Sequence, residues 1–167
     1  MVPSRIHLIN CNPTILNWIL EGDLVLSQNL KIKVPNNWTE FGRDIFKFSL
    51  NAINNNPKSQ IWFTYLPVEI KLNTLIGTCG FKGEPRDGLV EIGYEVSEAF
   101  RNKGYATEMV KLLINIALTS NLVNNIVAHT LPTNNPSVSV LKKCGFRFVA
   151  EIFDEDDGNL WKWNLSK

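Results

Sequence analysis

The chain has 167 residues, of which 44% are hydrophobic and 20% are charged, and its formal net charge is +1. These values are typical of a soluble globular protein, so we expect residues 1–167 to form a single domain that buries ~70% of its unfolded surface. A net charge near zero provides no global field for nucleic acid or an acidic membrane, although it permits a local anion site. We therefore expect neither nucleic acid nor a membrane as a partner.

Cysteine usage and apolar runs limit the class further. Cys11, Cys79 and Cys144 are widely spaced, and no CxxC pair suggests a zinc or redox site. We expect buried, reduced thiols and no metal. No apolar run approaches the ~20 residues that span a bilayer, and the first residues, MVPSRIHLINCNP, lack the long apolar core of a signal peptide. The resulting expectation is cytoplasmic localisation.

The first part of the chain predicts an edge strand at residues 6–9, followed by helices. Asn12 and Pro13 form a helix start, with asparagine as the N-cap and proline at the first helical position. Residues 24–30 predict a second short helix or a turn. A third helix is predicted from Thr39, its N-cap, to about residue 54. Its buried spine is expected to consist of Phe41, Ile45, Phe48 and Ala52, widened by Phe46, Leu50 and Ile53.

The rest of the chain predicts a mixed sheet. Three consecutive strands with short connections indicate an antiparallel meander, and the strand after the central helix is expected to lie parallel to the third of them. A short helix and a strand hairpin complete the chain. The fold class is therefore α/β (α+β in some schemes), with about six to seven strands. The predicted strands are residues 61–66, 74–81, 89–96, 125–131, 146–153 and 160–165, and the helices are residues 106 onward and 136–144.

A glycine-containing loop, R-N-K-G-Y-A at residues 101–106, follows the strand E-I-G-Y-E-V and opens the central helix. The first N–H groups of a helix lack internal partners and lie at the positive end of its dipole, an arrangement that favours phosphate. Gly104 permits close backbone approach, and Arg101 and Lys103 add positive charge. The pattern also fits an ordinary strand-to-helix turn with solvated cations, so the rest of the chain must decide.

A second stretch, N-N-P-S-V-S-V-L-K-K-C-G-F at residues 134–146, follows the loop. Together and in this order, the two resemble the GNAT superfamily of acyl-CoA-dependent N-acyltransferases, and more narrowly its ribosomal-protein N-terminal acetyltransferase branch. Arg101, Gly104 and Ala106 match the superfamily's first motif. The resemblance implies a GNAT fold, with helices on both faces of the sheet and strands splayed at the cofactor site. It also implies acetyl-CoA as the co-substrate, no metal, and direct acetyl transfer to a primary amine, either a protein N-terminus or a small molecule.

The resemblance assigns the cofactor to two segments. Its pyrophosphate is expected on the backbone N–H groups of the loop, and its pantetheine arm is expected to pair like an extra strand with the end of the preceding strand. Splayed strands leave N–H and C=O groups unpaired, and an amide-containing arm can satisfy them. Asn134 is expected to bond the pantetheine or the thioester region. The implied cofactor residues are Tyr94, Glu95, Val96, Arg101, Asn102, Lys103, Gly104, Tyr105, Ala106, Thr107 and Asn134.

Acetyl transfer also requires a proton for the leaving thiolate. Many superfamily members supply it from a tyrosine seven residues after the motif asparagine, but here that residue is Leu141. Ser137 lies one helical turn earlier on the same face and can replace the tyrosine, as is thought for the ribosomal-protein branch. Alternatively, its hydroxyl caps the helix backbone. We take Ser137 as the catalytic acid, and we count Asn134, which is expected to bond the thioester region, among the catalytic residues.

The amine must lose a proton, and Glu91 is the predicted base, acting through water. It lies on the strand that leads to the cofactor and shares a face with Glu95 by the two-residue period of a strand. The alternative is that Glu91 is a strand-surface carboxylate, in which case Glu95 and Glu84 are the other candidates. The resemblance to the GNAT superfamily also implies that a backbone N–H near Val96 polarises the thioester carbonyl.

Other features receive ordinary structural interpretations. His7 and His129 are expected to be ordinary strand residues, and the acidic run at residues 154–157 a solvated hairpin rather than a calcium loop. Trp161 and Trp163 are expected in the core or on a dimer surface, which makes a homodimer a candidate assembly. The alternative to an enzyme is an acyl-CoA-binding sensor or scaffold without catalytic activity.

Overall fold

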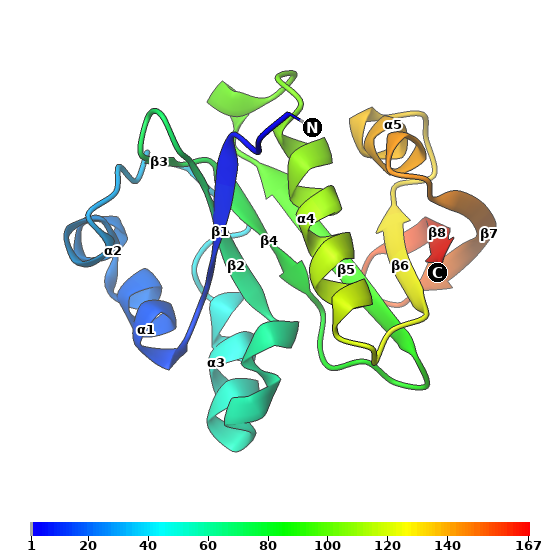
Figure 1. Ribbon diagram of the computed structural model, residues 1–167, viewed down its shortest axis with the longest axis horizontal. Coiled ribbons are helices and arrows are strands. Elements are labelled where there is room, and N and C mark those ends of the chain that lie inside the picture. Colours follow the sequence, from blue (N-terminus) through cyan, green and yellow to red (C-terminus); the bar gives the residue numbers. More distant parts are fainter. Residues whose placement is uncertain (1) are drawn as a thin grey trace.

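The computed structural model describes residues 2–167, which form one mixed eight-stranded sheet with the order β1-β2-β4-β5-β6-β8-β7, β3 pairing with β2 (Figure 1). β5 and β6 are parallel, and the other neighbours are antiparallel. The predicted mixed α/β fold is confirmed, with one extra strand because residues 74–81 divide at Ile76. The strands are β1 Ile6–Asn10, β2 Thr64–Glu69, β3 Thr74–Leu75, β4 Gly77–Phe81, β5 Leu89–Val96, β6 Asn125–Thr130, β7 Arg147–Asp154 and β8 Gly158–Ser166.

Helices cover both faces of the sheet, as expected. The hydroxyls of Ser49 in α3 and Thr64 in β2 hydrogen-bond at 2.9 Å on one face. On the other face, the Tyr94 hydroxyl donates to the Ser137 carbonyl of α5. Thr64 is paired with Gly80 of β4, and Gly80 is paired with Gly93 of β5, so Thr64 and Gly93 lie on the same face of the sheet. Tyr94 is the next residue after Gly93 and its side chain therefore points to the opposite face, so the two contacts lie on opposite faces. The helices are α1 Pro13–Glu21, α2 Asp23–Leu30, α3 Phe46–Asn55, α4 Tyr105–Thr119 and α5 Pro136–Lys143, with short 3₁₀ helices at Pro57–Trp62 and Glu98–Phe100.

The third helix begins later than predicted. The Thr39 hydroxyl donates to Glu95 Oε2 at 2.9 Å instead of capping a helix, and α3 starts at Phe46. Two residues of the predicted spine, Phe41 and Phe48, are 65% and 63% exposed. The buried face is instead formed by Phe46, Ser49 and Ile53. The predicted spine was therefore wrong. The Thr39 hydroxyl bonds to Glu95 of β5, so the helix starts later, and it turns the side of Phe46, Ser49 and Ile53 toward the core.

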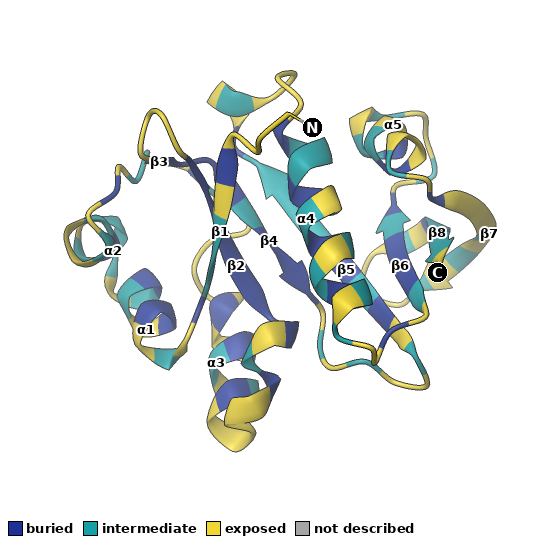
Figure 2. Ribbon diagram, in the orientation of Figure 1, coloured by how far each residue is buried: buried dark blue, intermediate teal, exposed yellow. Residues whose placement is uncertain are grey.

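The strand predicted at residues 61–66 is displaced. Residues 57–62 form a 3₁₀ helix, and β2 runs from Thr64 through Pro67 to Glu69. Proline has no N–H to donate to a neighbouring strand. In the sheet, however, Pro67 contributes its carbonyl, which accepts from the N–H of Ile76 at 3.1 Å. All six residues of β2 are buried, as the dark strand in Figure 2 shows, so both faces of this strand are covered.

The central helix α4 crosses the front of the sheet in Figure 1 and packs against β5 and β1. Met109, Val110, Leu113 and Ala117 are fully buried, with no exposed surface, and they recur at helical spacing. Burying each of the larger side chains contributes roughly 1.5–3 kcal/mol relative to leaving it in water. This packing fixes the N-terminus of α4 beside the end of β5. None of the helices within residues 2–167 is long and apolar enough to cross a membrane.

Candidate active site

β5 and β6 separate after a short parallel contact. Their register joins residues 89–91 to residues 125–127. Beyond this contact β5 continues to Val96 along β4, and β6 continues to Thr130 along β8. Figure 1 shows the two strands diverging toward their carboxyl ends. Within residues 2–167, the end of β5 therefore has a strand partner on one side, which is the splayed arrangement expected from the sequence.

Backbone direction at the end of β5 follows from two hydrogen bonds. The carbonyl of Glu91 and the N–H of Ser97 both bond to the β4 side, at 2.9 Å in each case. Because successive residues point their backbone groups to opposite sides, Tyr94 and Val96 direct theirs into the gap. The carbonyl of Val96 accepts from Arg101 Nε at 3.0 Å. An extended amide-containing chain could therefore pair here.

Glu95 is placed differently from its two neighbours. Its backbone faces β4, and its carboxylate accepts hydrogen bonds from the Thr39 hydroxyl at 2.9 Å and the Glu40 N–H at 2.6 Å. Glu95 thereby fastens the segment before α3 to the end of β5. A pocket of about 490 Å³ lies beside this junction, lined in part by Asp23, Trp38 and Thr39.

The loop at residues 101–107 carries the geometry that a phosphate cradle requires. Gly104 is the N-cap of α4 with φ +84°, and Asn102 has φ +60°, so the chain turns through left-handed backbone into the helix. Tyr105, Ala106 and Thr107 form the first turn of α4, whose N–H groups precede the first internal helical bond, from Glu108 N–H to the Gly104 carbonyl. These amides are available to an anion.

The two predicted cations of the loop already have partners. Arg101 pairs with Glu40 at 2.6 Å as well as with the Val96 carbonyl. Lys103 Nζ donates to the Ala99 carbonyl at 2.8 Å. These side chains therefore tie the loop to the end of β5, to the 3₁₀ helix that precedes the loop and to the segment before α3.

Arg5 is a cation at this loop that the sequence analysis missed. Its Nη2 donates to the Lys103 carbonyl at 2.8 Å, and its guanidinium lies 4.5 Å from the centre of the Tyr105 ring. Arg5 also pairs with Glu108 of α4. A residue from the N-terminal segment thus lies against the loop and adds positive charge beside the helix N-terminus.

Glu91 lies at the last paired position of the β5–β6 contact, opposite Val127. Its Oε1 is 2.7 Å from Lys82 Nζ and 2.8 Å from His129 Nδ1. Burial raises the pKa of Glu91, but hydrogen bonds and charge from Lys82 and His129 outweigh that effect and leave the pKa below its ordinary value. Glu91 is therefore ionised at neutral pH. His129, which was expected to be an ordinary strand residue, contacts its carboxylate. The third candidate, Glu84, accepts a hydrogen bond from Asn56.

Ser137 and Asn134 lie at the start of α5. The helix is capped by Asn135, whose side chain accepts from the Val138 N–H at 3.1 Å, so the Ser137 hydroxyl is not the cap. Asn134 is exposed immediately before the helix. The Tyr94 hydroxyl lies 3.3 Å from the Ser137 carbonyl and ties the end of β5 to this turn. Burial raises the pKa of Tyr94 to about 12.

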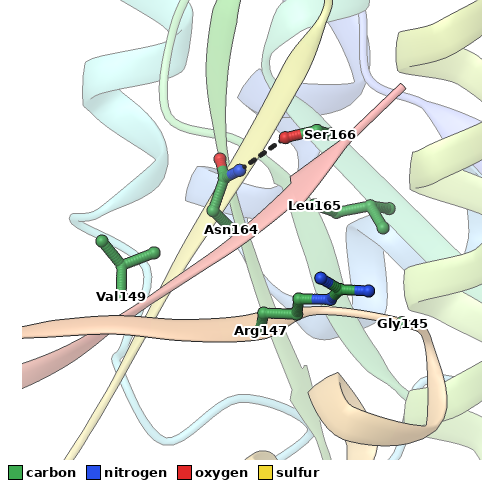
Figure 3. Close-up of a pocket in the computed structure, with 6 residues that line it drawn as sticks. All are labelled: Gly145, Arg147, Val149, Asn164, Leu165 and Ser166. Carbon is green, nitrogen blue, oxygen red and sulfur yellow. Dashed lines mark hydrogen bonds between the residues drawn. The ribbon is translucent and has the colours of Figure 1, made fainter.

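The remaining features do not add to this site. A pocket of about 450 Å³ lies at β7 and β8, and its lining, which includes Arg147 and Asn164 (Figure 3), contains none of the predicted site residues. In residues 2–167, no group of three or more His, Cys, Asp or Glu side chains could hold a metal ion. Trp163 is in the core, one of the two locations expected for it, and its Nε1 donates to Thr130.

Comparison with known proteins identifies the family. Residues 13–147 match the model of the acetyltransferase (GNAT) domain, so the chain belongs to this family. It is similar to an uncharacterised N-acetyltransferase, p20, of Bacillus licheniformis, with 39% identity over 74 residues, which cover 44% of this chain and 42% of p20. The matched segment thus spans less than half of that relative.

Solved structures share the fold over the whole chain. The ribosomal-protein-S5-alanine acetyltransferase of Vibrio fischeri has a TM-score of 0.70 at 16% identity, covering 99% of this chain and 95% of that one. RimL, a ribosomal L7/L12 alpha-N-protein acetyltransferase in complex with coenzyme A, has a TM-score of 0.71 at 13% identity, covering 99% and 96%. At these identities the likeness establishes the fold.

Proposed function

We propose that this protein is an acyl-CoA-dependent N-acetyltransferase that moves an acetyl group from acetyl-CoA directly to a primary amine, and that residues 1–167 act as one domain. The observation that carries the proposal is the gap between β5 and β6. It opens beside the N-terminus of α4, and the backbone groups of Tyr94 and Val96 face it. Helix N–H groups without internal partners, next to strand backbone that has no strand partner on that side within residues 2–167, suit a ligand with a pyrophosphate and two amides.

The donor contacts follow from this geometry. The amides from Asn102 to Thr107 would hold the pyrophosphate, with positive charge from Arg5, Arg101 and Lys103. Tyr94 and Val96 would pair with the pantetheine arm, Glu95 would support this strand from its other side, and Asn134 would bond the arm near the thioester. Acetyl-CoA supplies the acetyl group as a thioester. The residues that would contact it come from β5, the loop before α4 and the loop before α5.

Three groups would act on the reacting atoms. The Val96 N–H would donate to the thioester oxygen as negative charge develops there. The Glu91 carboxylate would accept the amine proton through water, as the nitrogen–carbon bond forms. Ser137 would donate its hydroxyl proton to the sulfur as the carbon–sulfur bond breaks. Asn135, and not this hydroxyl, caps α5, and within residues 2–167 the hydroxyl makes no hydrogen bond that would compete with this role.

The acceptor would approach the face of the sheet that carries Glu91, walled by the segment from Trp38 to Thr39 that Glu95 holds. We propose a protein N-terminus as the first acceptor to test, because two proteins of the same fold are ribosomal-protein acetyltransferases. A small amine is the second class. A catalytically silent acyl-CoA-binding domain is the competing function, and the observation that favours it is the buried Leu141 where many relatives have a tyrosine.

The test is release of free thiol from acetyl-CoA with a panel of acceptors, comprising peptides with different first residues, a polyamine, free amino acids and an aminoglycoside. The proposal predicts thiol release with at least one acceptor class. Ser137→Ala is expected to lower kcat by about 10²-fold or more while the Kd for coenzyme A stays constant. Coenzyme A binding without thiol release for any acceptor, unaltered by Ser137→Ala, would favour the silent binding domain.

A further inference from the structure

Glu91 is held by only one of its two carboxylate oxygens. Lys82 Nζ and His129 Nδ1 both approach Oε1, at 2.7 and 2.8 Å. Among residues 2–167, no hydrogen bond is made to Oε2. Because an ionised carboxylate only accepts, the imidazole must donate from Nδ1. One oxygen is therefore fixed by two donors, and the other remains free to accept a proton from a substrate.

His129 reaches Glu91 because of the strand register. Val127 is the partner of Glu91 across the parallel contact, and His129 lies two residues further along β6 on the same face. On β5 the position beyond Glu91 on that face is Gly93, which has no side chain to fill the space. The Lys82 side chain lies there instead, with its Cε 3.7 Å from where a Cβ of residue 93 would be, and the imidazole and the ammonium group meet the Glu91 carboxylate where the two strands separate.

The histidine is not explained by packing alone. Its Nε2 is buried and has no hydrogen-bond partner within residues 2–167, although buried polar atoms in folded proteins usually have one. The side chain is only 16% exposed, so the surrounding protein encloses most of it. Within residues 2–167 the one hydrogen bond made by its side chain is to the predicted base, Glu91, which points to a role for the histidine at that carboxylate.

Charged groups from four strands surround this contact. Lys82 follows β4, Glu91 belongs to β5, and Lys162 of β8 is in register with His129. Asp154 lies at the end of β7. Its pKa is lowered mainly by hydrogen bonds from the backbone N–H groups of Asp157 and Asp156, and to a smaller extent by the charges of Lys82 and His129. Lys82 is 57% exposed and therefore partly screened by water, whereas the imidazole is enclosed.

We propose that His129 is a positioning residue for Glu91: with Lys82 it fixes one carboxylate oxygen and so presents the other to the water that relays the proton from the amine of the acceptor. This inference rests on the proposed function, in which Glu91 accepts the amine proton. Without the imidazole, the carboxylate would lose its enclosed donor and could rotate about its side-chain bonds. Displacement of a reacting group by about 1 Å can cost 10²-fold in rate, so a contact of this kind has a measurable effect.

The experiment compares His129→Leu with His129→Asn and measures kcat/KM against pH. The amide nitrogen of asparagine can take the place of Nδ1, whereas leucine removes the donor. We expect His129→Leu to lower kcat/KM by about 10- to 100-fold and to move the acid limb of the profile to higher pH, because Glu91 then binds its proton more readily. His129→Asn should recover activity to within a few-fold of the wild type, and the Kd for coenzyme A should be unchanged in both.

Further variants separate the possible failures. Lys82→Met removes the other donor from a largely exposed site and should shift the acid limb in the same direction, even if His129→Leu does not fold. His7→Leu alters an exposed strand histidine away from the site and serves as the matched control. If Glu91→Gln is inactive but His129→Leu and Lys82→Met keep the wild-type profile, the positioning role is wrong and the proposed function stands. If Glu91→Gln is fully active, the assignment of the base in the proposed function is wrong.

Discussion

Replacement of Gly104 by alanine tests the phosphate cradle at the residue where backbone geometry and ligand approach meet. Gly104 has φ +84°, a conformation in which a Cβ costs about 1–2 kcal/mol. For a protein of this size that loss lowers Tm by about 2–8 °C. The new Cβ would also lie 3.3 Å from Arg5 Nη2, tighter than normal contact, and would displace this flexible side chain from the loop.

The ligand effect is separate from the stability effect. A hydrogen bond from a backbone amide to a charged phosphate contributes about 1.5–3 kcal/mol. If Gly104→Ala disturbs one such bond, the Kd for coenzyme A should rise at least tenfold, which corresponds to about 1.4 kcal/mol. Titration calorimetry at constant salt measures the Kd, and calorimetric melting measures Tm.

Gly158→Ala is the matched control for the strained backbone. Gly158 has φ +75°, no atom lies within 4 Å of an added Cβ, and the residue is in the β7–β8 hairpin away from the loop. It should lose a similar amount of stability and bind coenzyme A normally. Equal losses of stability in both variants, with the wild-type Kd retained in both, would refute the assignment of the loop to phosphate.

Three further predictions concern single groups. Ser137→Ala should slow thiol release but leave the thermal stability nearly unchanged, because the hydroxyl does not cap α5; a large loss of Tm in calorimetry would show that it does. The pKa of folded Glu91 lies below its ordinary value of 4.5, so Glu91 contributes stability that is complete above this pH and is lost as the pH falls through the lower, folded value. Glu91→Gln should therefore flatten the dependence of Tm on pH below about 5 relative to the wild type, and an unchanged slope would argue against the ion pairs. Burial raises the pKa of all three thiols, but Cys11 and Cys79 are buried whereas Cys144 is partly exposed, so a thiol reagent followed by mass spectrometry should label Cys144 first and label the other two only on unfolding.

Local patterns predicted some elements to the residue. The alternation over residues 89–96 gives the bounds of β5, and Asn12 caps α1 as expected, with its side chain accepting from the Ile15 N–H at 2.9 Å. Patterns failed where tertiary contacts decide. A strand was predicted at residues 61–66 from their aromatic and β-branched side chains, but residues 57–62 form a 3₁₀ helix and β2 begins at Thr64. Strand propensity mainly reports how well a side chain fits a half-buried surface, so it does not fix where a strand begins.

The candidate site shows the same division. The loop at residues 101–107 was recognisable because glycine, cations and the helix start are adjacent in sequence. Arg5 was missed because it contacts Lys103 from 98 residues away, and no local spacing can indicate that contact. His129 meets Glu91 through the parallel register of β5 and β6, which becomes known only when the strands are aligned. Period-two alternation with Val127 was the one available signal.

The most direct test of the central claim is to account for the acetyl group itself. The protein is incubated with acetyl-CoA carrying an isotopic label in the acetyl carbons and with the acceptor that gives the fastest thiol release, and the products are analysed by mass spectrometry. Direct transfer predicts one labelled acetyl group on the amine of the acceptor for each coenzyme A released, with loss of both products in Glu91→Gln. Released coenzyme A accompanied by free labelled acetate and an unmodified acceptor would contradict the proposed function.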